Sequence, residues 1–410
     1  MQFLRSNPLG IQQLRVSDDL DLVRGLAAFA VLIYHVRYRF FYDYADVHAP
    51  NVLGKLFYSA TSFGHDAVII FFVLSGYFIS ASVLRDAVKQ RWSWGRYAVS
   101  RLTRLYLVLI PGLLLTLFWD RLGLWLFPEH PIYSGQATWI NDYFPVAQRI
   151  SPRIFAANLG FLQTVVAPPL GSNEALWSLS NEFWYYVLFP LAWFALVWPT
   201  RWLKSIVGLL IFAAILWYVG ISHNRGIADY FPIWLLGTAV CVLPPIKRWQ
   251  RNYGGWFTAA ALGLFCVVLA TTHVGAVKQL LRESQLAIDY FTGVSFALTL
   301  YVLLHNQLPV ANGQSSATSG AYAKLARGLA GCSYTLYLTH LPILVFIRGA
   351  GTAEPWLPDG YHMVLAFLLT VLCLGFAFGI AKVTEARTAA VRDYFLRRLS
   401  SGMTRQTAKS

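Results

Sequence analysis

The apolar stretch 20–42 carries two residues, Arg24 and His35, whose types and spacing could do chemistry. At about 100° per residue, eleven residues make three helical turns plus about 20°, so both side chains would project from one face, about 16 Å apart along the axis. An arginine in a membrane-spanning run costs at least ~2.5 kcal/mol, which makes it a functional candidate. The pair predicts an imidazole acting as general base and a cation binding an anion. A snorkelling arginine and a lone hydrogen-bonded histidine are the alternative.

Glu182, within Trp177–Tyr186, is the second catalytic candidate. It lies seven residues inside the outer end of a predicted helix, and His35 lies at the same depth in its own helix, about 10 Å at 1.5 Å per residue. A carboxylate beside an imidazole can hold the ring and stabilise its protonated form, so we expect Glu182 to orient His35. Equal depth leaves the direction of each side chain open, and coincidence is the alternative.

Two pairs of neighbouring polar residues have more ambiguous roles. Ser75 and Gly76 interrupt an apolar run. Small residues there usually serve close helix packing, although the Ser75 hydroxyl could also bind substrate. His65 and Asp66, at the outer end of the same predicted helix, could orient a substrate hydroxyl or face water.

Ser333, Tyr337 and His340 recur at positions i, i+4 and i+7, which places them on one face of a predicted helix. This polar stripe is expected to face the interior of a helical bundle. It is either part of a binding site or a hydrogen-bonded packing seam, and the spacing leaves both open.

Two segments between apolar runs have compositions that suit ligands. Segment 85–104 interleaves basic and aromatic residues, which is typical of a positive-inside anchor or of a docking site where Arg101 and Arg104 bind phosphates. The second segment, 125–153, is aromatic and polar. Its Trp139 and Tyr143 could stack on sugar rings or belong to an interfacial belt.

The elements that must position these residues follow from composition. Of 410 residues, 57% are hydrophobic and only 13% are charged, which excludes a soluble globular protein. Recurrent apolar runs of about 20 residues predict an all-α polytopic membrane protein with about ten transmembrane helices. The predicted helices are 20–42, 62–84, 104–124, 175–198, 203–222, 227–243, 254–272, 285–304, 329–349 and 360–382. A further apolar piece, 154–168, looks too short to span and is predicted to be re-entrant or interfacial.

Charge gives the orientation. The net charge is +14, and Lys and Arg gather in alternate loops, which predicts cytoplasmic N and C termini. We therefore divide the chain into a cytoplasmic N-terminal segment (1–19), a transmembrane domain (20–382) and a basic cytoplasmic tail (383–410), the last a helix on the inner leaflet. The positive charge is assigned to membrane lipids and not to nucleic acid.

Several site types are not expected. The four cysteines stand alone in apolar stretches without metal-ligand spacing, so neither a metal nor a disulfide framework is predicted. No removable signal peptide is visible at the N-terminus. A GxSxG elbow and a reactive cysteine in a polar setting are both missing, which favours chemistry without a covalent enzyme intermediate but does not decide the question.

Together these motifs resemble those of the acyltransferase-3 family, membrane-embedded enzymes many of which O-acetylate cell-surface glycans. The resemblance runs in order over nearly the whole chain. Its motifs are Arg24-x10-His35, the run Phe71–Phe78 with its Ser-Gly, Arg101-x2-Arg104-Leu105-Tyr106, Leu176–Tyr185 and Ser333–His340. One departure is the missing proline after Glu385-Ala386-Arg387, so no function is drawn from Glu385.

The resemblance implies a ten-helix core in a bacterial cytoplasmic (inner) membrane, acetyl-CoA or a related acyl-CoA as donor, and an acceptor hydroxyl on the outer side. It also implies that Arg24 and His35 are essential. The acceptor is expected to be a glycan or lipid-linked saccharide, contacted by His65, Asp66, Trp139 and Tyr143.

These expectations define a mechanism. Arg24, Arg101 and Arg104 would hold the polyanionic donor from the inner side. His35, oriented by Glu182, would take the proton of the acceptor hydroxyl. The donor-side hydroxyls of Ser75 or Tyr337 could hydrogen-bond the oxyanion.

A transporter is the alternative interpretation of the sequence. Ten helices with buried Arg, His and Glu would also suit a proton-coupled flippase or exporter of a sugar-containing metabolite. No inverted-repeat symmetry supports it in the sequence. The oligomeric state is left open.

Overall fold

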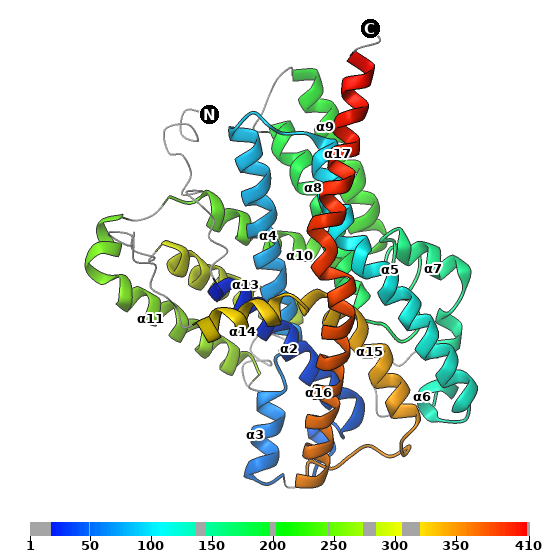
Figure 1. Cartoon of the computed structure of the whole chain (residues 1–410). Coiled ribbons are helices and arrows are strands. Elements are labelled where there is room, and N and C mark those ends of the chain that lie inside the picture. Colours follow the sequence, from blue (N-terminus) through cyan, green and yellow to red (C-terminus); the bar gives the residue numbers. More distant parts are fainter. Residues whose placement is uncertain are drawn as a thin grey trace. The chain divides into compact units, whose positions relative to one another are not determined.

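The structure is a computed structural model and describes residues 18–48, 50–136, 145–196, 202–244, 247–273, 284–305 and 320–407. Within these ranges every regular element is a helix (Figure 1). The long helices are α2 (Asp18–Phe40), α4 (Gly64–Val88), α5 (Trp94–Leu126), α8 (Leu176–Leu196), α9 (Trp202–Ile215), α10 (Arg225–Val242), α11 (Lys247–Thr272), α13 (Gln285–His305), α14 (Gly320–Ala330), α15 (Ser333–Gly349), α16 (Gly360–Val383) and α17 (Thr388–Thr407). The shorter ones are α3 (Val52–Ala60), α6 (Pro131–Ser134), α7 (Pro152–Leu159), η1 (Tyr44–Asp46), η2 (Val146–Arg149), η3 (Leu216–His223) and η4 (Glu385–Arg387).

Each of the ten predicted segments falls on a helix. In chain order they are α2, α4, α5, α8, α9 with η3, α10, α11, α13, α15 and α16. Apolar runs fold this way because a helix satisfies its backbone N–H and C=O groups within one segment. The all-helical fold class is therefore confirmed for the described residues.

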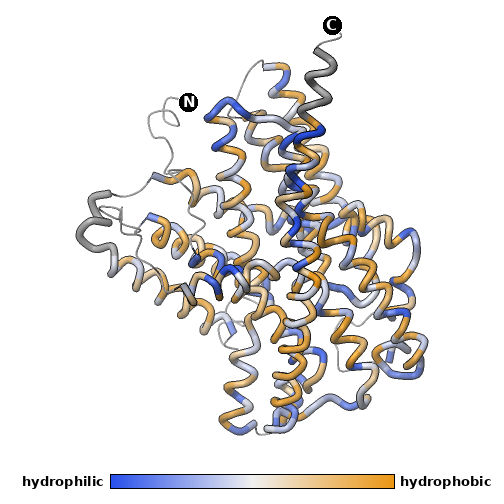
Figure 2. Tube along the Cα trace, in the orientation of Figure 1, coloured by the Kyte–Doolittle hydropathy of each residue, from blue (hydrophilic) through white to orange (hydrophobic). Residues whose placement is uncertain are grey.

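Fewer than ten of the described helices are long and apolar enough by themselves to cross a membrane. Six stretches of the described chain are long and apolar enough: Val52–Val88, Trp94–Leu126, Trp202–His223, Gly255–Thr272, Gln285–His305 and Gly360–Leu399. The bent pair α14 and α15, with 52° between its members, adds a seventh if it is one span. Figure 2 shows apolar residues along much of α16 and more polar residues on α17. The chain is thus a multi-pass membrane protein by the apolarity of six to seven helices.

The described residues form two compact units. Apart from the gaps given above, the first unit comprises 18–20, 65–91 and 181–325, and the second comprises 21–64, 92–180 and 326–407. In the first, α13 packs on α10 and α11. In the second, α5 packs on α15 and α17, and α15 packs on α16.

Two helices of the first unit meet backbone to backbone. A Cβ added to Gly76 of α4 would overlap the carbonyl oxygen of Trp234, and one added to Gly237 of α10 would overlap the carbonyl of Val73. Only glycine fits at such a crossing, since any side chain would separate the two backbones. The packing role predicted for Ser75-Gly76 is confirmed for Gly76.

α5 begins earlier than predicted. Its first turn is capped by Ser93, whose side chain accepts a hydrogen bond from the backbone N–H of Arg96. Arg101 and Arg104 therefore lie in the second and third turns of a helix, whereas the sequence analysis placed them at the end of a loop. The cap is the physical reason, because it satisfies the first N–H groups of a helix that begins outside the apolar run.

Two predicted non-spanning pieces are also helical. α7 has eight residues, about 12 Å at 1.5 Å per residue, which is too short to cross a membrane. α17 occupies most of the predicted basic tail and packs against α5.

Candidate functional site

A pair of histidines lies in the second unit. The Nδ1 atom of His35 on α2 is 3.0 Å from Nε2 of His340 on α15, and the ring centroids are 5.0 Å apart. His340 is fully buried, and His35 is half-buried. The first catalytic candidate is therefore in contact with a second imidazole.

The hydrogen bonds of this pair assign its protons. Nδ1 of His340 lies 2.9 Å from the carbonyl oxygen of Leu336, and a carbonyl can only accept, so Nδ1 carries a proton. In the neutral ring Nε2 of His340 then accepts, and Nδ1 of His35 donates to it. This series of hydrogen bonds leaves the lone pair of the His35 ring on Nε2, which is the atom that can act as a base.

Tyr337 lies one turn before His340 on the same face of α15. Its hydroxyl is 2.6 Å from that of Ser178, and its ring centroid is 6.2 Å from that of His340. The third member of the polar stripe, Ser333, donates to the carbonyl of Ala330 at the start of the helix. The stripe is buried; His340 belongs to the histidine pair, and Tyr337 adjoins it.

A cluster of charges lies around Glu385, also in the second unit. Its carboxylate accepts hydrogen bonds from the backbone N–H and the hydroxyl of Thr335, at 3.2 and 3.1 Å. Arg104 and Arg24 are the cations whose charges act on this carboxylate. Arg24 is also 3.4 Å from the Asp21 carboxylate. The structure thus places Arg24 and Arg104 near enough to one carboxylate for their charges to act on it.

Arg101, the third proposed donor-binding cation, projects from α5 one turn before Arg104. Its guanidinium carbon lies 5.5 Å from the ring centroid of Tyr97. Stacking on an aromatic face restricts the side chain, because the planar guanidinium and the ring attract each other.

Glu182 and Ser75 meet in the first unit. The Ser75 hydroxyl donates to Oε1 of Glu182 at 3.0 Å, and the Tyr186 hydroxyl donates to the same oxygen. The indole N–H of Trp234 donates in turn to Ser75 at 3.2 Å. The one hydroxyl proton of Ser75 is thus directed to the carboxylate in this conformation.

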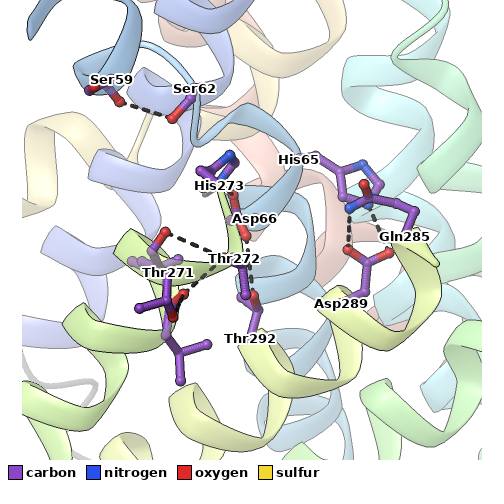
Figure 3. A network of polar contacts seen from close by, with 12 residues as sticks. Ser59, Ser62, His65, Asp66, Thr271, Thr272, His273, Gln285, Asp289 and Thr292 are labelled. Atoms are coloured by element: carbon purple, nitrogen blue, oxygen red, sulfur yellow. Dashed lines mark hydrogen bonds and ion pairs between the residues drawn. The ribbon is translucent and has the colours of Figure 1, made fainter. Parts of the chain in front are cut away.

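His65 and Asp66 belong to a polar network of the first unit, shown in Figure 3. Nε2 of His65 is 3.0 Å from Oδ2 of Asp289, and Nε2 of His273 is 2.8 Å from Oδ2 of Asp66. Thr292 donates to the other oxygen of Asp66 at 3.1 Å. Each buried carboxylate thereby holds a histidine that is about one-third exposed.

Not every predicted residue can be placed against the others. The second unit holds Arg24, His35, Arg101, Arg104 and Tyr337, while the first holds His65, Asp66, Ser75 and Glu182. Each unit is described by itself, so the pairing of Glu182 with His35 stays a prediction. Trp139 and Tyr143 lie outside the described residues.

Two site residues were missed. Asp289 is a carboxylate within a predicted span, and the rule that selected Arg24 would have selected it. His340 was noticed only as part of a stripe. Its contact with His35 joins residues 305 positions apart, and no local signal gives that.

Comparisons with known proteins find similarity to acyltransferases. The acyltransferase-3 family model, described as an acyltransferase domain, matches residues 17–382. The chain is 26% identical to a protein named O-acetyl transferase from Shigella phage Sf6 over 301 residues, 70% of this chain and 74% of that protein. It is 25% identical to acyltransferase MdmB from Streptomyces mycarofaciens over 384 residues, 87% of this chain and 88% of that protein. No solved structure matches the chain significantly.

Proposed function

Because the chain belongs to the acyltransferase-3 family, we propose that it moves an acetyl group from cytoplasmic acetyl-CoA to a hydroxyl of a cell-surface glycan. The observation that carries the proposal is the His35–His340 pair, which leaves a basic nitrogen on a half-buried ring. The names of both relatives support transfer of an acyl group over transport. A glycan such as an O-antigen or an exopolysaccharide is proposed as acceptor because sugars present many hydroxyls of the required kind.

The proposed setting is a bacterial inner membrane crossed by ten helices, with both termini in the cytoplasm. In support, all ten predicted segments are helical, and Lys and Arg gather in alternate loops. In this orientation Arg24 lies toward the cytoplasm and His35 toward the outer side of α2.

The proposed reaction is a direct transfer. Nε2 of His35 takes the proton of the acceptor hydroxyl, and the oxygen of that hydroxyl attacks the thioester carbonyl. The carbon–sulfur bond of the thioester then breaks. The imidazolium then returns the proton to the departing thiolate. His340 accepts from Nδ1 throughout, so the cation that forms on His35 keeps a hydrogen-bond partner.

The donor is proposed to bind at Arg24, Arg101 and Arg104. The three cations face two carboxylates, Glu385 and the Asp21 that pairs with Arg24, which leaves one positive charge in excess for the phosphates of acetyl-CoA. This charge balance fits a polyanion. No metal is part of the proposal.

The remaining candidates are given supporting roles. Glu182 is proposed to orient His35, and Ser75 or Tyr337 to donate to the oxyanion after exchanging its present partner. His65 and Asp66, with Trp139 and Tyr143, are proposed to contact the acceptor. Partly exposed imidazoles backed by carboxylates suit hydrogen bonding to sugar hydroxyls.

Replacing His340 tests its role as a positioning residue. His340→Leu removes the acceptor of the His35 proton, and we expect kcat to fall roughly a hundredfold. In His340→Gln the amide oxygen can accept that proton, so most of kcat should return. Steady-state kinetics of both variants, with Tm as a check on folding, measure this. Equal losses in the two variants would make His340 a packing residue only.

Replacing the donor-side arginines separates donor from acceptor. In Arg101→Ala and Arg104→Ala we expect KM for acetyl-CoA to rise about tenfold, and KM for the acceptor to stay within about twofold. Lys89→Ala is the control, since Lys89 is an exposed cation of the same basic segment. An effect confined to the acceptor KM would contradict both the assignment and the orientation.

The function itself is tested with protein purified in detergent, where no ion gradient exists. Labelled acetyl-CoA and an acceptor oligosaccharide should yield labelled glycan, whereas a transporter would leave both reactants unchanged. Mass spectrometry of surface polysaccharide from a deletion strain identifies the acceptor by the acetyl substituent that is lost. An unchanged glycan together with a missing acylated small molecule would move the acceptor to another class.

A further inference from the structure

Arg37, in the last turn of α2, is held in an unusual way. Its guanidinium carbon lies 5.3 Å from the ring centroid of Tyr34 and 5.4 Å from that of Tyr58. Its Nε atom is buried without a hydrogen-bond partner. Among the described residues no carboxylate forms an ion pair with Arg37. Two aromatic rings therefore fix a cation whose donors are not used within the described chain.

The neighbouring arginines make the contrast clear. Arg39, two residues on, pairs with Glu174. Arg348 donates to the backbone carbonyls of Arg39, Thr352 and Ala353. Both are nearly fully buried and both have oxygen partners. The Nε atom of Arg39 also lacks a hydrogen-bond partner, but Arg39 and Arg348 each have an oxygen partner and Arg37 has none within the described chain.

Asp43 and Asp46 act electrostatically on the Tyr58 side chain that Arg37 contacts, but neither forms an ion pair with Arg37 within the described chain. Asp43 caps η1 by accepting from the backbone N–H of Ala45 at 3.3 Å. Glu354 accepts from the Tyr42 hydroxyl at 3.2 Å. An arginine at a helix end is often explained by the helix dipole alone. That explanation accounts for the charge but not for a guanidinium clamped between two rings.

Arg37 is also close to the candidate base. The Tyr34 ring that carries its guanidinium packs edge-on against the His35 ring, with 5.3 Å between the ring centroids. Since each of the two contacts spans 5.3 Å, the guanidinium carbon lies at most about 11 Å from the His35 ring. That separation is comparable to one or two sugar rings.

From this geometry we propose that Arg37, clamped by Tyr34 and Tyr58, binds an anionic group of the acceptor, so that the substrate is a negatively charged saccharide. The inference rests on the proposed function and specifies its substrate class. Carboxylate and phosphate share the chemistry that a guanidinium recognises through paired N–H donors. The two sources are a uronic acid within the glycan and the diphosphate of a lipid-linked saccharide.

Matched acceptors test the proposal in the full-length protein. One pair is a uronic-acid oligosaccharide and its neutral methyl ester, and the other is a short-chain isoprenyl diphosphate disaccharide and the free disaccharide. In Arg37→Gln the KM for the charged member of one pair should rise about tenfold, while its neutral partner and acetyl-CoA change less than about twofold. The pair that responds identifies the anion. Arg37→Lys should retain part of the preference, and Arg153→Gln, at an exposed arginine of α7, should leave every KM unchanged.

Calorimetric titration of each acceptor without acetyl-CoA separates this inference from the proposed function. Charge-selective binding that is lost in Arg37→Gln, in a protein that transfers no acetyl group, would uphold the anion site and overturn the function. Transfer with equal KM for charged and neutral acceptors would uphold the function and overturn the anion site. Equal loss of both acceptors in Arg37→Gln would also overturn it, since that result indicates damage to the fold.

Discussion

Replacing His35 by glutamine lowers the rate of acetyl transfer by at least about a thousandfold in the mechanism proposed here. Glutamine has an amide N–H that can still donate to Nε2 of His340, so the buried contact with α15 survives. It has no basic nitrogen to take the proton of an acceptor hydroxyl. The loss should therefore appear in kcat, with little change in either KM.

The measurement is the initial rate with labelled acetyl-CoA on protein that elutes as one species. His305→Gln is the matched control, because the His305 ring also contacts the carbonyl four residues before it and lies at the end of α13. It should keep nearly wild-type turnover. More than a tenth of the wild-type rate in His35→Gln would remove this residue from the proton transfer.

Replacing Gly237 by valine should prevent the first unit from folding. The added side chain would meet the backbone of Val73 and Tyr77, and backbone cannot rotate away as a side chain can. Overpacking of this kind costs about 3 kcal/mol or more when neither helix can move. Gly76→Ala should behave similarly against the Trp234 carbonyl.

The effect on stability is measured as the Tm, from the folded protein that remains after heating in size-exclusion chromatography. Gly375→Ala and Gly379→Ala are the controls, because nothing lies within 4 Å of a Cβ at either position of α16. There alanine should be neutral or slightly stabilising, since it favours a helix by about 1 kcal/mol over glycine. A Tm unchanged in Gly237→Val would show that the two helices can separate without cost.

The helices could be located from sequence, since a long apolar run has few other ways to satisfy its backbone. The start of α5 could not be read from hydropathy, because its first turns carry Arg96, Arg101 and Arg104. A signal was present in Ser93, a residue that favours the position before a helix. Charge indicated a loop, whereas the cap produced a helix.

The individual site residues could be chosen from sequence, but their partners could not. Arg24 and His35 stand out because a charge in an apolar run is costly. The hydrogen bonds from Ser75 to Glu182 and between His35 and His340 join positions more than a hundred residues apart. Such contacts depend on how helices turn about their axes when they pack, and hydropathy carries no record of that.

Because α2 is continuous, it fixes the distance between the residues that it carries. Arg24 and His35 lie on one continuous helix, so their separation is set by the rise per residue and no loop can adjust it. Adding a single residue between them would turn His35 by about 100° relative to Arg24, away from either His340 or the donor-side cluster. If Arg24 binds the donor as proposed, the number of residues between Arg24 and His35 thus sets the length of donor that can reach the base.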